Sequence, residues 1–204
     1  PYCWTMSDSA RCGSGDLDTG NPSAGGRRLA DSGEGFAVVL SGTERSMAMG
    51  DIFDTMYDFF QQEDWKFERM GEQPILRMGI NGKNGKWACY AQAREDQEQF
   101  VFYSVCPVNA PDDKRVTIAE LLTRLNYGLV IGNFEMDMRD GEIRYKTSVD
   151  VEGDRVSHAL VRNVVFVNLQ MMDRCLPAIM GCMYGGLSPQ QAADQLETQG
   201  GLPQ

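Results

Sequence analysis

The chain has 204 residues, of which 42% are hydrophobic and 24% are charged, so it is long enough for one globular domain with a sizeable core. Its formal net charge of −10 disfavours binding to nucleic acid and to anionic lipids, and it favours basic partners. No apolar run is long enough to span a membrane, and the first 50 residues lack the apolar stretch of a signal peptide. We therefore expect a soluble, cytoplasmic protein with no nucleic acid or membrane partner.

The cysteine pattern favours core packing over metal binding. Six cysteines stand at positions 3, 12, 89, 106, 175 and 182. Their even number is compatible with disulfides, but a chain this rich in core residues does not need them. There is no CxxC pair and only one histidine, His158, so a structural zinc site is not expected. We predict reduced cysteines in a reducing compartment, and neither a metal nor a cofactor.

The N-terminal part of the chain differs in composition from the rest. Residues 1–46 are rich in Gly, Ser and Asp and show no apolar period, so they cannot bury enough surface to offset their ordering entropy. We predict a disordered or weakly ordered tail over 1–46, a domain over 47–199 and a second tail over 200–204. Asp16 and Asp18 are similar to the opening of a calcium loop without its closing glutamate, and a calcium-responsive protein is a third functional alternative.

The periodicity of apolar residues gives the order of elements in the domain. A helical period from Ser46 to Asp64 is followed by periods of two, then by a capped helix from Thr117 to Gly128. The four strands predicted between these helices cover 65–70, 75–80, 86–94 and 100–106. Two more strands flank Asp140-Gly141, and two helices follow, over 157–184 and from Ser188 onward. The order α-ββββ-α-ββ-α-α predicts an α+β fold, with an antiparallel sheet packed by helices.

The Asp140-Gly141 hairpin allows a prediction of register. A two-residue type I′ turn there would place 139 opposite 142, 137 opposite 144, and 135 opposite 146. One face would then pair Arg139 with Glu142, Asp137 with Arg144, and Glu135 with Lys146. The other face would carry Phe134, Met136, Ile143 and Tyr145 toward the core. These charge pairs predict a solvated structural face more than a catalytic carboxylate cluster.

The helix over 157–184 has apolar residues around most of its circumference, and Pro177 should kink or interrupt it near Leu176. One sheet face cannot cover so many apolar residues, which suggests a homodimer and a protein-binding surface. The residues proposed for that surface are Tyr57, Phe59, Val161, Val164, Val165, Met171 and Met172. The alternative is that both sides of the helix are buried within one chain. The methionines, twelve in all, are either core residues or the lining of an adaptable groove.

Four segments in the second half of the domain carry a family resemblance. They are Tyr103–Val108 (YSVCPV), Leu122–Leu129 (LTRLNYGL), Gly132–Asp137 (GNFEMD) and Asp140–Asp150 (DGEIRYKTSVD). Together they resemble the YbjN-type bacterial sensory transduction regulators, over roughly residues 49–197. The resemblance implies a fold similar to that of the type III secretion chaperones. Members of the family are often dimeric and bind proteins, and the family has no catalytic residues to carry over.

The expected function is therefore that of a non-enzymatic protein-binding module, chaperone-like or a regulatory adaptor, with a protein partner and a homodimeric state. The alternative is an enzyme whose site lies near the 135–146 hairpin, at Asp137, Arg139, Arg144 and Lys146. Unpaired carboxylates with strongly shifted pKa values in a pocket would favour the enzyme. An apolar surface patch would favour the binding module.

Overall fold

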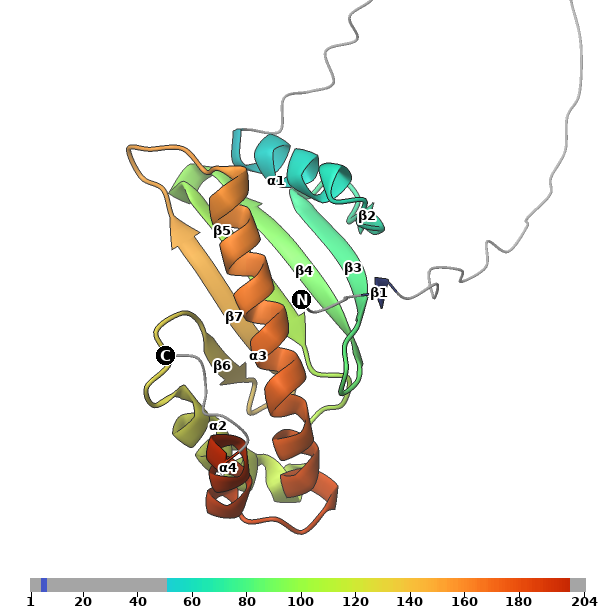
Figure 1. The fold of residues 1–204 in the computed structure, drawn as a ribbon, viewed down its shortest axis with the longest axis vertical. Helices are drawn as coiled ribbons and strands as arrows, with labels where there is room; N and C mark the ends of the chain where they lie inside the picture. The colour runs from blue at the N-terminus through green and yellow to red at the C-terminus, as the bar shows by residue number, and fades with distance from the viewer. Residues whose placement is uncertain (1–4, 7–50, 199–204) are drawn as a thin grey trace, which may run out of the picture.

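The computed structural model describes residues 5–6 and 51–198 (Figure 1). Its helices are α1 (Asp51–Gln62), α2 (Arg115–Asn126), α3 (His158–Tyr184) and α4 (Pro189–Thr198), and its short 3₁₀ turns cover Glu95–Gln97 and Asp112–Lys114. Its strands are β1 (Thr5–Met6), β2 (Phe67–Arg69), β3 (Ile75–Asn81), β4 (Lys86–Arg94), β5 (Gln99–Val105), β6 (Asn133–Met136) and β7 (Ile143–Asp150). From α1 onward, this confirms the predicted order and the α+β class.

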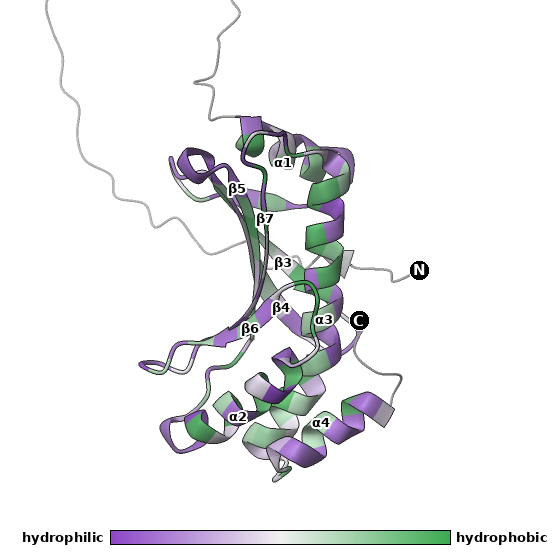
Figure 2. Ribbon diagram, turned by 90° about the vertical axis from the view of Figure 1, so that its left-hand side faces the viewer, coloured by the Kyte–Doolittle hydropathy of each residue, from purple (hydrophilic) through white to green (hydrophobic). Residues whose placement is uncertain are grey.

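The strands form one antiparallel sheet in the order β1-β3-β4-β5-β7-β6, and β2 also pairs with β3. Figure 2 shows the sheet with α1 and α3 on one side, and α2 and α4 near the C-terminal half of α3. Along β4, the buried residues Trp87, Cys89, Ala91 and Ala93 alternate with half-buried or exposed ones. This period of two sends every second side chain into the helical layer. Among the described elements, no helix covers the other face.

The N-terminal segment contributes a short strand. Thr5 and Met6 pair with Asn81 and Ile80 at one edge of β3. The other residues of the predicted tail over 1–46, Asp16 and Asp18 among them, lie outside the described residues, as does the predicted tail over 200–204. The domain division stays a prediction.

Pro177 does not interrupt α3, which runs unbroken through all of its 27 residues. A proline inside a helix leaves the carbonyl four residues earlier without its donor. Here that carbonyl belongs to Asp173, and Asn84 in the β3–β4 turn hydrogen-bonds to it. The interruption predicted near Leu176 is therefore wrong, and the alternative of a kink stays a prediction. A residue distant in sequence replaces the missing donor.

The predicted register of the β6–β7 hairpin is wrong by two residues. Glu135 lies opposite Arg144, and Met136 lies opposite Ile143. The loop is longer than a two-residue turn, and Gly141 has a positive φ of 77° while Asp140 does not, so the type I′ turn is absent. Because the shift is even, the predicted core face keeps its orientation.

Tertiary contacts of Gly141 explain the longer loop. Its carbonyl accepts a hydrogen bond from the N–H of Ala110 at 2.8 Å. A Cβ at position 141 would lie 2.0 Å from the carbonyl oxygen of Ala110, so only glycine fits there. The carboxylate of Asp140 accepts a hydrogen bond from the N–H of Glu142 at 2.9 Å, which closes the loop.

Candidate protein-interaction site

The surface proposed from the sequence is mostly interior in the folded chain. Six of its seven residues are buried: Phe59, Val161, Val164, Val165, Met171 and Met172. The seventh, Tyr57, is half-buried, with its ring edge-on to Phe67 at a centroid distance of 5.2 Å. These side chains therefore form no exposed surface of the described chain.

The cause is that α3 is covered on several sides at once. It contacts β5 and β7 of the sheet, and also α1, α2 and α4. The alternative that both sides of the helix are buried within one chain is thus what the structure shows, and the argument for a homodimer from α3 loses its basis. Met56, Met171, Met172 and Met183 are core residues and do not line a groove.

A different set of apolar side chains is exposed. Tyr127 is 90% exposed, Val130 is 76% exposed and Ile131 is 47% exposed, and all three lie in the connection between α2 and β6. We call these three residues the apolar loop. Sequence reasoning missed it, although a run of apolar residues between Gly128 and Gly132, outside any helical or strand period, was a usable signal.

The apolar loop is held in place by the backbone around it. The N–H of Tyr127 donates to the carbonyl of Thr123, and the N–H of Leu129 donates to the carbonyl of Asn126, each at 3.2 Å. The buried Tyr145 donates its hydroxyl to the carbonyl of Ile131. Leu129, which stands between Tyr127 and Val130 in the sequence, is half-buried and packs against the core. The exposed side chains therefore stand on an anchored segment, which reduces the entropy lost when a partner binds.

Two carboxylates of the charged hairpin, Glu135 and Asp137, are paired with cations. Asp137 pairs with Arg139 at 2.6 Å, and the hydrogen bonds from Arg139 lower the pKa of Asp137 to about 2. Partial burial raises the pKa of Glu135, but Lys146 and Arg144 more than offset this effect, so the pKa lies below its usual value. Both carboxylates are ionised at neutral pH, and neither can donate a proton there.

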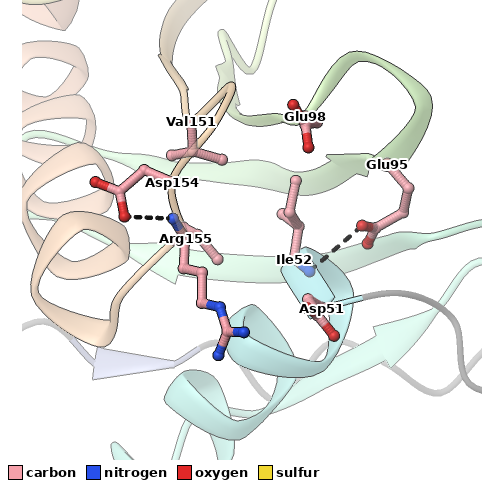
Figure 3. A pocket seen from close by; sticks show the side chains of 8 residues that line it. Asp51, Ile52, Glu95, Glu98, Val151, Asp154 and Arg155 are labelled. Carbon is pink, nitrogen blue, oxygen red and sulfur yellow. Dashed lines mark hydrogen bonds between the residues drawn. The ribbon is translucent and has the colours of Figure 1, made fainter.

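An open cavity of about 230 Å³ lies beside the N-terminus of α1 (Figure 3). It is smaller than the roughly 300–1,000 Å³ of small-molecule sites. Its lining combines apolar and charged residues: Asp51, Ile52, Glu95, Glu98, Val151, Asp154, Arg155 and Val156. The carboxylate of Glu95 accepts hydrogen bonds from the N–H groups of Phe53 at 2.8 Å and Ile52 at 3.4 Å. Glu95 therefore caps the helix, which is a structural role.

His158 and the described cysteines, the remaining candidates for catalysis or metal binding, pack against other residues of the fold. His158 begins α3 and lies edge-on to Phe59 at 6.2 Å between ring centroids. The cysteines at 89, 106, 175 and 182 are free and buried. Within 51–198 and β1, no three His, Cys, Asp or Glu side chains are placed to hold a metal ion. None of the helices described is both long and apolar enough to cross a membrane.

Comparison with known proteins identifies the family. The model of the YbjN family, described as "Putative bacterial sensory transduction regulator", matches residues 53–180. A solved structure, the "Crystal structure of YbjN, a putative transcription regulator from E. coli", is similar with a TM-score of 0.48 and 12% sequence identity, covering 59% of this chain and 85% of that one. None of the curated proteins matches the chain. Since the family model covers more than half of the sequence, the chain belongs to the YbjN family.

Proposed function

We propose that the chain is a non-enzymatic regulatory module that acts by binding another protein through the apolar loop. The observation that carries this proposal is the exposure of Tyr127, Val130 and Ile131 on an anchored segment. Exposed aromatic and aliphatic side chains that are held rigidly are typical of interface anchors. Membership of a family of regulators supports the same function.

The charged residues of the chain support a binding role over an enzymatic one. In the hairpin, Glu135, Asp137 and Glu142 each pair with a neighbouring arginine or lysine, and Glu95 caps a helix. A carboxyl group acting as a general acid at the hairpin would need a raised pKa, whereas Glu135 and Asp137 have lowered ones. Four buried, free cysteines fit a reducing compartment, so we propose a cytoplasmic location.

Site-specific photo-crosslinking in cells tests the proposal. A photoreactive residue replaces Val130 in one variant of the full chain. In the matched control it replaces Tyr184, which is 62% exposed at the end of α3. We expect adducts with another protein from position 130 and few from position 184. Equal adducts at both positions, or none at position 130, would refute a binding role for the apolar loop.

Substitution of the loop supplies the second measurement. Because Tyr127 and Val130 are exposed, replacing both by serine leaves the melting temperature nearly unchanged. The same double variant should lose at least about tenfold in affinity for the crosslinked protein, as removal of an interface anchor does. If position 130 crosslinks instead to a second copy of the chain, the partner is the chain itself, and the loop is a homodimer interface.

A further inference from the structure

Among the described strands, β6 is the last of the sheet, and one of its edges has no strand partner. β6 pairs with β7 on one side only. In an antiparallel ladder, alternate residues turn their N–H and C=O groups away from the partner strand. The N–H of Asp137 donates to the carbonyl of Glu142 at 2.9 Å, so the backbone polar groups of Asp137 point toward β7. By alternation, the backbone N–H and C=O groups of Phe134 and Met136 point away from β7. Such an edge can template pairing with another strand.

A side chain of α2 hydrogen-bonds to the backbone N–H and C=O groups of Phe134 that point away from β7. Asn126 donates from Nδ2 to the Phe134 carbonyl at 3.0 Å, and the Phe134 N–H donates to Asn126 Oδ1 at 2.7 Å. We call this pair of hydrogen bonds the edge clamp. One primary amide thus reproduces the two bonds that a residue of a neighbouring strand would make.

The other end of α2 is tied to the same hairpin. Arg115 donates from Nη1 to the carbonyl of Met138 at 3.1 Å. Arg115 and Asn126 are the first and last residues of α2, and the helix contacts β6. The helix therefore lies along the open edge, fixed at both ends, which is one of the ways in which proteins cover an edge strand.

We propose that α2 is a cover for the β6 edge, and that the edge clamp keeps β6 from pairing with β6 of a second copy of the chain. Without the clamp, the outward N–H of Phe134 has no partner among the described residues, and its carbonyl keeps only a long contact of 3.4 Å with Asn133 Nδ2. An antiparallel pair of identical strands satisfies them in both copies, because a two-fold axis makes the contact self-complementary. This proposal is independent of the apolar loop and of its partner.

The test compares Asn126→Ala with Arg124→Ala in the full chain. Arg124 is a matched control, since it lies in the same helical turn but bonds to Glu120 and Gln190 and not to β6. In Asn126→Ala kept dilute enough to be monomeric, hydrogen exchange of the Phe134 amide should be about tenfold faster, the factor given by loss of one ordinary hydrogen bond. Light scattering should show a mass that rises with concentration. Arg124→Ala should match the wild type in both measurements.

A second variant keeps the proposal testable if Asn126→Ala folds poorly. Asn126→Asp keeps an acceptor for the Phe134 N–H and loses the donor to the Phe134 carbonyl. The Phe134 amide should then stay protected as in the wild type. Unchanged exchange in monomeric Asn126→Ala, or fast exchange in monomeric Asn126→Asp, would overturn the edge clamp. A monomer mass for Asn126→Ala at every concentration would overturn the pairing with a second copy.

Discussion

The side chain of Asn84 donates a hydrogen bond at 3.0 Å to the backbone carbonyl of Asp173. That carbonyl lies four residues before Pro177, which has no N–H to donate back along α3. The backbone N–H of Asn84 also donates to Oδ1 of Asp173 at 2.8 Å. The β3–β4 turn thus supplies from outside the helix the donor that proline removes, and it ties the turn to a buried carboxylate.

This contact predicts energetic coupling between Asn84 and Pro177. Asn84→Ala should lower the free energy of unfolding by about 1–2 kcal/mol, because it leaves a buried carbonyl without a donor. In a Pro177→Ala background, Asn84→Ala should lower the free energy of unfolding by less, since residue 177 then has a backbone N–H that can donate to the carbonyl of Asp173. Urea denaturation of the four proteins measures the coupling.

Asn109→Ala serves as the control for this cycle. The side chain of Asn109 donates to the carbonyl of Asp140 at 3.2 Å in an exposed position. Its removal should therefore lower the free energy of unfolding by less than about 0.5 kcal/mol. Additive costs of Asn84→Ala and Pro177→Ala would contradict the role assigned to Asn84.

Gly141 should tolerate no side chain. Its φ is 77°, and a Cβ would lie 2.0 Å from the carbonyl oxygen of Ala110. Gly141→Ala should therefore destabilise the chain by more than about 2 kcal/mol, from backbone strain and overpacking together. Gly153→Ala is the matched control, since φ is 74° with nothing within 4 Å of the Cβ, and only about 1 kcal/mol of strain is expected. Similar melting temperatures for the two variants would show that the contact with Ala110 is unimportant.

Asp137 should titrate far below its usual range. Hydrogen bonds from Arg139 lower its pKa from 3.8 to about 2. A carboxyl group with a lowered pKa stabilises the fold above its unfolded pKa, and this contribution is lost as the pH falls from about 4 to about 2. NMR titration of the side chain should follow this window in the wild type and shift upward in Arg139→Gln. Lys83→Gln, in the β3–β4 turn, should leave the titration unchanged, and an unshifted curve in Arg139→Gln would rule out the pairing.

The buried cysteines should be inert in the native chain. Burial raises the pKa of Cys89 and of Cys175 to about 12 in each case, so the reactive thiolate is scarce at neutral pH. Alkylation of these two positions, followed by peptide mapping, should be at least about 100-fold slower than in chain denatured by guanidinium chloride. Fast labelling of either residue in the native chain would mean that its surroundings open readily.

The exposure of the apolar loop and the presence of the edge clamp could not be predicted from the sequence. The run of apolar residues around Tyr127 and Val130 is visible in the sequence, but its exposure depends on which elements pack against it. The edge clamp is not visible at all, because nothing local marks Asn126 as a partner of Phe134. Both depend on which elements lie side by side, which is a non-local property.

The sequence by itself determined the order of the elements and the side of each strand that faces the core. Both follow from local periods of 3.6 and 2, and a slip of two residues leaves the period of two intact. Only the tertiary structure decided the hairpin register, through the contact of Gly141 with Ala110. It also decided that Val161, Val164 and Met172 are interior and that α3 continues through Pro177. The physical reason is that burial and the replacement of a missing donor depend on residues far apart in the chain.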